Sequence, residues 1–598
     1  WNTSWWAYSR SGETFPPKGV VALEVGDYNP LLGMSYNSIA SLSRSTHRSQ
    51  GFGSTIARGE ETEYFEHLTG DSAAKDVFEN VDFTWFRFGD YKLAKKIESE
   101  IEKILSKFND ADPSLSVKSL LELKATINDA ENADWKARKQ AEIDKIITHC
   151  LGLWVSFNPV DFYACHGDTA TFILKALNRS SVPVIAKNIS YLDETRTLDD
   201  TKLELNKNTE LLVLKKFIDV KIPLTQPYWL NAEHGPALFN FKDPLSIGAL
   251  DIQPTKTAKV LFEVEGELVQ IEIPVEYVWR NGAKGELRRP FEIRARVSSN
   301  FEHPVFLFTQ EKTQEVVITT TTQIKGIKVR LEPQLPKGWE VIPAFINYQS
   351  TFAGQKQKFT FKVTPSKNAQ SGEIKAIAIE QGFEHNRSLV EIEYEHIPSQ
   401  IVQAEAKSKL VFEPISISNK KIGYLQGAGD DVSTALAAIG YDVTELIESN
   451  IDESSFAEFD VVILGIRTFN TIDNMPNIYQ YLLKYCEQGG KVIVQYNTSR
   501  GVLTDEIGPY GLTLSSDRIT DETAEMKILE PQHPMFNRPN KITQKDFEGW
   551  VQERGLYFPH EWPKEYTAML ESADPGEESL KGALVVANYG KGKYIYTG

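Results

Sequence analysis

The stretch "KKIGYLQGAGDDVSTALAAIGYDVTEL" at residues 420–446 joins a short apolar run to a helical pattern and then to a second apolar run. Two further stretches continue the alternation, "FDVVILGIRTF" at 459–469 and "NIYQYLLKYCEQGGKVIVQY" at 477–496. Short apolar strands separated by helices are typical of a parallel sheet, because parallel strands need a crossover connection. The sequence therefore predicts a doubly wound parallel α/β domain over residues 418–598.

Upstream of this domain, the hydrophobic period changes to two. In "DTATFILKALNRSSVPV" at 168–184, the residues Phe172, Leu174 and Ala176 fall on one face of a strand that breaks at Asn178. A strand, turn and proline recur in "RPFEIRARVSSNFEHPV" roughly 120 residues later, about the length of one sandwich domain. We therefore expect two tandem Ig-like β-sandwiches, at 156–275 and 276–398, followed by a polar linker at 399–417.

The region at 61–155 has a helical period. In "YKLAKKIESEIEKILSKF" at 91–108, apolar residues recur at three- and four-residue spacing, with Lys and Glu at the other positions. A second pattern with the same period runs from Ile143 to Trp154. These patterns predict a helical bundle or hairpin, and the preceding residues 1–60 form a separate segment.

The segment "SIASLSRSTHRSQGFGS" at 38–54 predicts a helix whose last turn carries His47 and Arg48. Tyr36, Ile39 and His47 lie on one stripe of this helix, so we expect the imidazole to be semi-buried where the helix packs.

Two interpretations of this helix end stay open. In the first, Arg44 and Arg48 complement the helix dipole, Gln50 satisfies loose carbonyls and Gly51 terminates the helix. In the second, the helix end points into a polar cleft, where His47 or an arginine contacts a substrate.

Composition excludes some classes of function. The 598-residue chain has a formal net charge of −17, which argues against a nucleic-acid surface because such affinity comes from Lys and Arg. Its three cysteines form no CxxC motif, so neither a disulfide framework nor a zinc knuckle is encoded. The sequence also lacks an apolar run of the roughly 18 residues that a membrane span requires.

The N-terminal residues carry a family resemblance. "WNTSWWAYS" at 1–9 and "YNPLLGMSYNSIASLSRSTHRSQGFGS" at 28–54 resemble the C-terminal part of the PIG-L (LmbE-like) zinc-dependent de-N-acetylases, in their long multidomain Bacteroidetes-type form. The closing helix of that family has an A-x-x-x-x-x-x-H-x-S-Q pattern, matched here by Ala40, His47, Ser49 and Gln50. The resemblance continues through "PYWL", "PVEYVWRNGAKGELRRPFEI" and "LPKGWEV", which are similar to NEW3-type Ig-like modules, to "HPMFNRPNKITQKDFEGWVQERGLYF" at 533–558.

The resemblance implies that residues 1–60 are the remnant of a Rossmann-like α/β deacetylase domain. It implies a periplasmic or secreted enzyme that uses zinc to hydrolyse the acetamide of N-acetylated sugars of the N-acetylglucosamine type. The family's His-Pro-Asp-Asp-Glu and His-x-x-His motifs occur nowhere in the chain. We therefore expect a fragment truncated at both ends, with those motifs upstream of Trp1, that lacks the metal site and is inactive alone.

The same resemblance suggests site residues. His47 is expected to flank or brace the catalytic pocket without binding zinc, and the candidate substrate contacts are Arg44, Arg48, Gln50, Trp5 and Trp6. The tryptophans belong to an aromatic cluster that could stack on a sugar ring or simply form a small hydrophobic cluster under a loop.

The C-terminal domain resembles class I glutamine-amidotransferase-like, or ThuA-like, proteins. Catalytic members carry a cysteine on a strand-to-helix elbow, where this sequence places Ile466 and Arg467. Cys486 falls in a helical pattern instead, so we expect a non-catalytic domain. The dinucleotide-like loop "QGAGDDV" ends on Val432 rather than a small residue, which makes it a weak match.

Two functions remain. The first is the accessory part of a deacetylase of N-acetylated sugars, and the alternative is a non-catalytic carbohydrate-binding or scaffolding multidomain module. In either, "GWVQERGLYF" at 549–558 offers Trp550, Glu553 and Arg554 for carbohydrate contact or for a domain interface.

Overall fold

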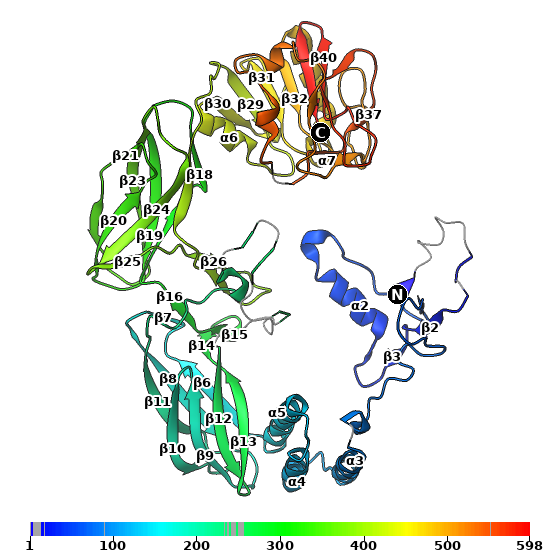
Figure 1. The fold of residues 1–598 in the computed structure, drawn as a ribbon, viewed down its shortest axis with the longest axis vertical. Helices are drawn as coiled ribbons and strands as arrows, with labels where there is room; N and C mark the ends of the chain where they lie inside the picture. The colour runs from blue at the N-terminus through cyan, green and yellow to red at the C-terminus, as the bar shows by residue number, and fades with distance from the viewer. Residues whose placement is uncertain are drawn as a thin grey trace. The chain divides into compact units, whose positions relative to one another are not determined.

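The computed structural model describes residues 2–3, 14–16, 18–88, 90–232, 234–235, 238–240, 247–248, 256–550 and 552–598 (Figure 1). The fold is mixed and rich in strands. The chain divides into two compact units. The first comprises Trp1–Phe157, Ile173–Val213 and Thr257–Pro274, and the second Asn158–Phe172, Leu214–Lys256 and Val275–Gly598. No helix in the described ranges is long and apolar enough to cross a membrane.

The first unit begins with a small antiparallel sheet and one helix. The sheet has the order β1-β5-β2, with strands at Asn2–Thr3, Thr62–Phe65 and Val21–Glu24. A hairpin of β3 (Tyr28–Asn29) and β4 (Met34–Ser35) leads into helix α2 (Tyr36–Ser45). The Ser35 hydroxyl accepts a hydrogen bond from the backbone N–H of Ser38 at 3.1 Å and so caps the first turn of the helix.

Three helices follow in the same unit: α3 (Tyr91–Ser106), α4 (Val117–Ile127) and α5 (Ala133–Cys150), with 3₁₀ turns η2 (Trp85–Phe88) and η3 (Pro113–Ser116). The predicted amphipathic helix at 91–108 is confirmed, and it buries Ala94 and Ile97. The second helical pattern ends earlier than predicted. Trp154 begins strand β6 (Trp154–Pro159), because α5 stops at Cys150 and Gly152 adopts a φ of +57°.

A buried carboxylate connects these helices to a sheet of the same unit. Asp144 of α5 forms an ion pair with Lys124 of α4 and accepts a hydrogen bond from the backbone N–H of Gln270 at 3.0 Å. Lys124 also donates to the carbonyl oxygen of Leu268 at 2.6 Å. Because the Asp144 side chain is only 7% exposed, both charges depend on these partners to offset their desolvation.

The region predicted as the first sandwich forms two main sheets, the first of which is antiparallel. One sheet has the order β10-β9-β12-β13, with strands at Glu194–Lys202, Val184–Tyr191, Thr257–Val264 and Glu267–Pro274. Another has the order β11-β8-β6, with β11 at Thr209–Phe217 and β8 at Thr169–Leu177. The predicted alternation in β8 is confirmed, because Phe172, Leu174 and Ala176 are fully buried and the strand ends before Asn178.

Two sheets of the second unit share a hydrophobic core. The first has the order β17-β19-β23-β21, with strands at Val297–Phe301, Gln314–Thr322, Gln355–Pro365 and Trp339–Ile342. The second has the order β18-β28-β24-β20-β22, with strands at Val305–Phe308, Lys407–Phe412, Gly372–Glu380, Lys328–Gln334 and Ile346–Gln349, and β25 (Phe383–His385) pairs with β24. Val297 and Phe361 from one sheet and Leu331 and Ala376 from the other belong to one buried cluster, which is the packing of a sandwich.

The predicted linker at 399–417 is wrong over most of its length. Strand β27 (Gln400–Val402) pairs with β26 (Val390–Ile392), and β28 pairs with both β18 and β24. Exposed Lys407 and Lys409 alternate with buried Ser408 and Leu410 in β28. Because of this polar composition, the sequence did not indicate the strand. A hairpin of β14 (Glu276–Asn281) and β15 (Gly285–Pro290), and a parallel pair of β7 (Tyr163–Cys165) and β16 (Glu292–Arg294), complete this part.

The C-terminal part is built on a seven-stranded sheet of order β30-β29-β31-β32-β41-β40-β38 (Figure 1). The first five strands are parallel and lie at Asp442–Leu446, Lys421–Leu425, Val461–Leu464, Lys491–Val494 and Gly592–Thr597. β40 (Leu584–Tyr589) and β38 (Tyr566–Ala568) run antiparallel, so the prediction of a parallel sheet is wrong for these two. Short strand pairs accompany the sheet: β33 (Thr513–Leu514) with β37 (Pro559–Glu561), β34 (Arg518–Ile519) with β36 (Gly555–Leu556), and β35 (Lys527–Ile528) with β39 (Leu570–Glu571).

Both faces of this sheet are covered. Val462 and Leu464 of β31 belong to the same cluster as Leu482 of helix α8 (Met475–Gln488). The intervening Ile463 belongs to a second cluster, against which Leu436 of helix α6 (Val432–Ile439) packs. Alternate residues of the strand therefore pack against helices on opposite faces of the sheet. Because both faces are buried, the strand sequence is apolar at successive positions.

The Asp144 pair gives a test of the fold. We expect Asp144→Asn to lower the local stability of α4 and α5 by about 3 kcal/mol, because Lys124 would remain buried without a counter-charge. Hydrogen exchange of peptides from the two helices measures this loss. Glu142→Gln is the control, since its carboxylate is half exposed and pairs with Lys139 at the surface, where about 0.5 kcal/mol or less is expected. Equal exchange in the two variants would contradict a structural role for the buried pair.

Candidate functional site

The candidate residues at the end of α2 lie close together. His47 precedes the 3₁₀ turn η1 (Arg48–Gln50), and its Nδ1 lies 3.1 Å from Oε1 of Gln50. Arg44 donates from Nε to the carbonyl oxygen of Phe52 at 3.2 Å, and its guanidinium lies 5.3 Å from the centre of the Phe52 ring. The segment thus presents a paired imidazole and amide beside an arginine that is held against the following loop.

The prediction that His47 is semi-buried is wrong. Its side chain is exposed, as are those of Tyr36 and Ile39 on the same stripe. The buried residue of α2 is Asn37, whose amide donates to Oε2 of Glu61 at 2.6 Å. Within the described residues, the helix is anchored through this polar contact, and the apolar stripe faces outward.

The residues present do not fit a zinc centre. In the described ranges, no group of three or more His, Cys, Asp or Glu side chains is arranged to hold a metal ion. A catalytic zinc needs about three protein ligands, whereas the partner of His47 is the Gln50 amide. The end of α2 can therefore offer hydrogen bonds to a ligand, but the described residues do not assemble the family's metal site.

The structure gives different results for the candidate tryptophans and for Arg554. Trp5 and Trp6 lie outside the described residues. Trp550 is 43% exposed, whereas Arg554 is buried and donates to the carbonyl oxygens of Ala524, at 3.0 Å, and Phe547. The suggestion that Arg554 contacts carbohydrate is therefore wrong, because backbone carbonyls hold its guanidinium.

The elbow of the C-terminal domain carries no thiol. Arg467 occupies the turn after β31 with a φ of +59°, a conformation that side chains other than glycine seldom adopt. Cys486 is fully buried in α8, and burial raises the pKa of its thiol to about 11. A nucleophilic cysteine needs an exposed site that stabilises the thiolate, so Cys486 does not meet the requirement.

The loop at 426–432 is also closed to a phosphate group. The Asp430 carboxylate accepts hydrogen bonds from the Tyr424 hydroxyl and from the backbone N–H groups of Val432, at 3.0 Å, and Ile466, at 3.1 Å. A Cβ atom added at Gly427 would lie 2.1 Å from the carbonyl oxygen of Ile466. Gly427 is therefore needed for the close approach of two loops, and the carboxylate uses N–H groups that could otherwise bind an anion.

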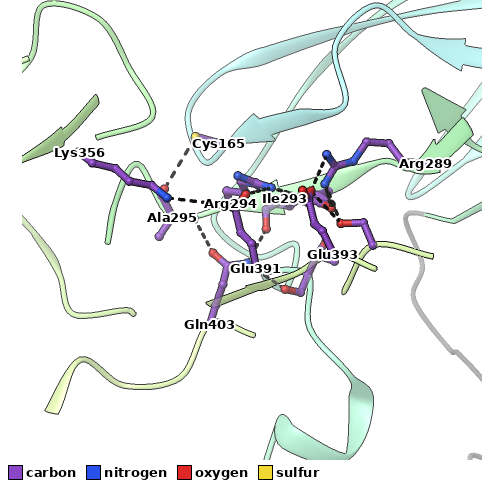
Figure 2. Close-up of polar contacts among 12 residues, drawn as sticks. Cys165, Arg289, Ile293, Arg294, Ala295, Lys356, Glu391, Glu393 and Gln403 are labelled. Carbon is purple, nitrogen blue, oxygen red and sulfur yellow. Dashed lines mark hydrogen bonds and ion pairs between the residues drawn. The ribbon is translucent and has the colours of Figure 1, made fainter. Parts of the chain in front are cut away.

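A network of buried charges, which the sequence did not indicate, lies around β16 (Figure 2). Glu292 is 2% exposed and accepts hydrogen bonds from Arg294, at 2.6 Å, and from Arg289, at 2.8 Å. Arg294 also pairs with Glu391 at 2.9 Å, and Arg289 with Glu393 at 3.3 Å. Each arginine thus has two carboxylate partners, which offset the desolvation of its charge.

Gln403 connects the same strand to two other segments (Figure 2). Its amide donates to the carbonyl oxygens of Thr225 and Ile293, both at 2.9 Å, and accepts from the backbone N–H of Ala295 at 2.9 Å. The side chain is 1% exposed. A buried amide with this many bonds fixes the relative positions of the chain segments that it contacts.

Arg296 forms a second buried ion pair beside this network. It donates to both carboxylate oxygens of Glu380, at 2.8 and 3.0 Å, and to Asp168 at 2.9 Å. Arg296 lowers the pKa of Glu380, so the carboxylate stays ionised. Nε2 of the neighbouring His385 lies 3.4 Å from Glu380, and burial lowers the pKa of the imidazole.

Arg296, Glu380 and His385 line a cavity of about 810 Å³ that lies wholly within the second unit. Its wall includes His166, Asn231, Arg296, Glu380, Phe383 and His385. Sequence analysis missed this site, because its residues come from five segments far apart in the chain. One sequence feature could have indicated part of the site, the "EQG" turn at 380–382. This turn directs β25 back along β24 and so places Phe383 and His385 near Glu380.

Comparisons with known proteins identify no family. No family model and no curated protein matches the chain. Among solved structures, the chain is similar to E. coli alpha-2-macroglobulin in its native conformation, with 12% identity over 43% of this chain and 17% of that chain and a TM-score of 0.16. A protein of unknown function from Porphyromonas gingivalis matches with 11% identity over 43% of this chain and 99% of that chain, with a TM-score of 0.14. At such TM-scores the likenesses carry no argument.

The Glu380 pair predicts a pH-dependent stability. Arg296 holds the folded-state pKa of Glu380 below its ordinary value, so the stabilisation is present above the unfolded pKa of about 4.3 and is lost as the pH falls through the folded pKa. We expect Glu380→Gln to destabilise this unit by about 3 kcal/mol at pH 7, and the difference from wild type to shrink below about pH 4.

Hydrogen exchange of peptides from β24 at several pH values measures this effect. The control is Glu332→Gln, whose carboxylate pairs with Arg330 at the surface of the same sandwich. A loss of stability in Glu380→Gln that stays constant down to pH 3 would contradict the pair as its cause.

Thiol labelling tests the interpretation of the cysteines. Burial raises the pKa of Cys165 to about 12 and that of Cys486 to about 11, whereas Cys150 is partly exposed. In the folded protein at pH 8, we expect a maleimide to label Cys150 first and the other two only after denaturation, as mass spectrometry of peptides would show. Rapid labelling of Cys486 would contradict the non-catalytic interpretation of the C-terminal domain.

Proposed function

We propose that this chain is the accessory part of a zinc-dependent deacetylase of N-acetylated sugars, in which the end of α2 forms one wall of the catalytic pocket. The observation that carries the proposal is the placement of the PIG-L-like pattern. Its His47 and Gln50 form an exposed polar pair at a helix end, where a ligand can reach both. The catalytic metal would be bound by a segment with the family's His-Pro-Asp-Asp-Glu motif, which these 598 residues do not contain.

The apolar surface around α2 supports this interpretation. Leu31 is 95% exposed, Leu32 57%, Tyr36 49% and Leu42 48%. Leaving several such side chains in water forgoes roughly 1.5–3 kcal/mol each relative to full burial. A metal-binding segment that packed on this face would bury them and would bring its site next to His47.

The chemical contribution of this wall is hydrogen bonding and orientation. With Nδ1–H of His47 donating to Oε1 of Gln50, the neutral ring leaves the Nε2 lone pair to accept a hydrogen bond from a sugar hydroxyl or an acetamide N–H. Arg48 is exposed in the adjacent turn and can donate to the same ligand. By the same resemblance, we place the protein in the periplasm or outside the cell.

A non-catalytic carbohydrate-binding or scaffolding module is the second candidate. The observation that favours it is the cavity of about 810 Å³ in the second unit, which exists without any metal-binding segment. In this interpretation the chain binds a glycan and releases no acetate.

Acetate release tests the deacetylase proposal. The chain would be assayed with N,N′-diacetylchitobiose and zinc, alone and together with a PIG-L segment that carries both missing motifs. We expect turnover only in the combined sample. We also expect His47→Ala to lower kcat/KM at least tenfold, because a ligand-binding group would be lost from the pocket wall.

His67→Ala is the matched control, since His67 is an exposed histidine of the same unit that contacts the carbonyl oxygen of Gly70. Stoichiometric zinc with turnover by the chain alone would overturn the proposed division of roles. A His47→Ala variant with unchanged kcat/KM would overturn the role of the α2 wall.

A further inference from the structure

The cavity of the second unit has no role in the deacetylase proposal. It is lined by residues from 166–167, 220–231, 295–296, 380–387 and 403, all within that unit. Its volume of about 810 Å³ falls within the range of small-molecule sites in proteins. The identity of its lining residues limits the kind of ligand it can hold.

The Arg and Glu side chains that line the cavity are balanced in number. Arg296 is bonded to Glu380 and Asp168, so its guanidinium is not available to an anionic ligand. The other two charged residues of the lining, Glu384 and Arg387, have opposite signs. The lining therefore has no excess of one charge sign that would favour a polyanionic or polycationic ligand.

Free hydrogen-bonding groups remain at the rim. The side chains of Glu384, Asn386 and Arg387 make no hydrogen bond or ion pair with any other described residue. Asn231 accepts a bond from Gln226 through Oδ1 at 2.9 Å, and its amide N–H groups make no bond within the described ranges. These side chains thus offer both donors and acceptors, which suits a ligand rich in hydroxyl groups.

An exposed aromatic ring completes the site. Phe383 is 72% exposed although it belongs to β25, and it follows a turn in which Gln381 and Gly382 have φ values of +49° and +87°. Two successive positive φ values are typical of the tight hairpin turn that fixes the following residue in position. A rigid phenyl ring at the rim offers a flat apolar surface on which the C–H face of a sugar ring can pack.

We infer that this cavity is a binding site for a neutral oligosaccharide, with Phe383 as the stacking surface and Asn231, Asn386, Glu384 and Arg387 as the hydrogen-bonding groups. The inference rests on the proposed function only for the choice of sugar, an N-acetylglucosamine oligomer. The buried Glu380 and the partly buried Arg296 and His385 hold the floor in shape and are not required to contact the sugar.

The test measures binding of chitotetraose and cellotetraose to the whole chain by isothermal titration calorimetry and saturation-transfer NMR. We expect Phe383→Ala to weaken the binding of the better ligand about tenfold, which corresponds to about 1.4 kcal/mol. Asn231→Ala should weaken it severalfold. The control is Phe352→Ala, because Phe352 is 58% exposed in the same sandwich and does not line the cavity; its affinity should stay within twofold of wild type.

The outcomes separate this inference from the deacetylase proposal, because the readout is binding by this chain and not acetate release. Failure of both neutral tetrasaccharides to bind at millimolar concentration would overturn the inference. Equal affinities in the Phe383 and Phe352 variants would also overturn it, since the sugar would then bind elsewhere. Tighter binding of a sulfated oligosaccharide than of the neutral ones would show that the ligand class is wrong.

Discussion

The second unit depends on the requirement that every charge buried along residues 289–296 has a partner. Glu292 and Arg294 are nearly inaccessible to water, so each needs several hydrogen bonds to offset its desolvation. Glu292 accepts from Arg289 and Arg294, Arg294 also pairs with Glu391 of β26, and Arg296 binds Asp168 and Glu380. Segments far apart in sequence are therefore held to one strand by charge and by the Gln403 amide as well as by apolar packing.

The same requirement explains the chemistry of the cavity. Because Arg296 and Glu380 satisfy each other, they give the floor a fixed shape without a net charge. The rim differs, since its polar groups are exposed and free to bind a ligand. The lining combines these polar groups with apolar side chains such as Ile222, Leu224 and Leu230, and we infer that this mixture suits the hydroxyl groups and C–H faces of a sugar.

The two features that resemble catalytic families have opposite structural environments. The end of α2 is exposed, and exposed apolar side chains lie beside it. The C-terminal elbow is closed, with Asp430 bonded to its neighbours and Cys486 buried in α8. Of these two features, the end of α2 is the more accessible to a ligand, and for this reason the proposed function centres on α2 and not on the C-terminal domain.

The sequence by itself determined the helix at 91–108, the strand at 169–177 and four of the five parallel strands of the C-terminal sheet, because local periodicity and apolar runs report which faces of an element are buried. The sequence did not indicate strand β28 within the predicted linker, because exposed lysines alternate with its buried residues. It also predicted that the stripe of α2 that carries His47 packs against the protein, whereas His47 is exposed. Tertiary structure alone decided the cavity. Its residues come from distant segments, and the pairing of buried charges that unites them leaves no periodic pattern in the chain.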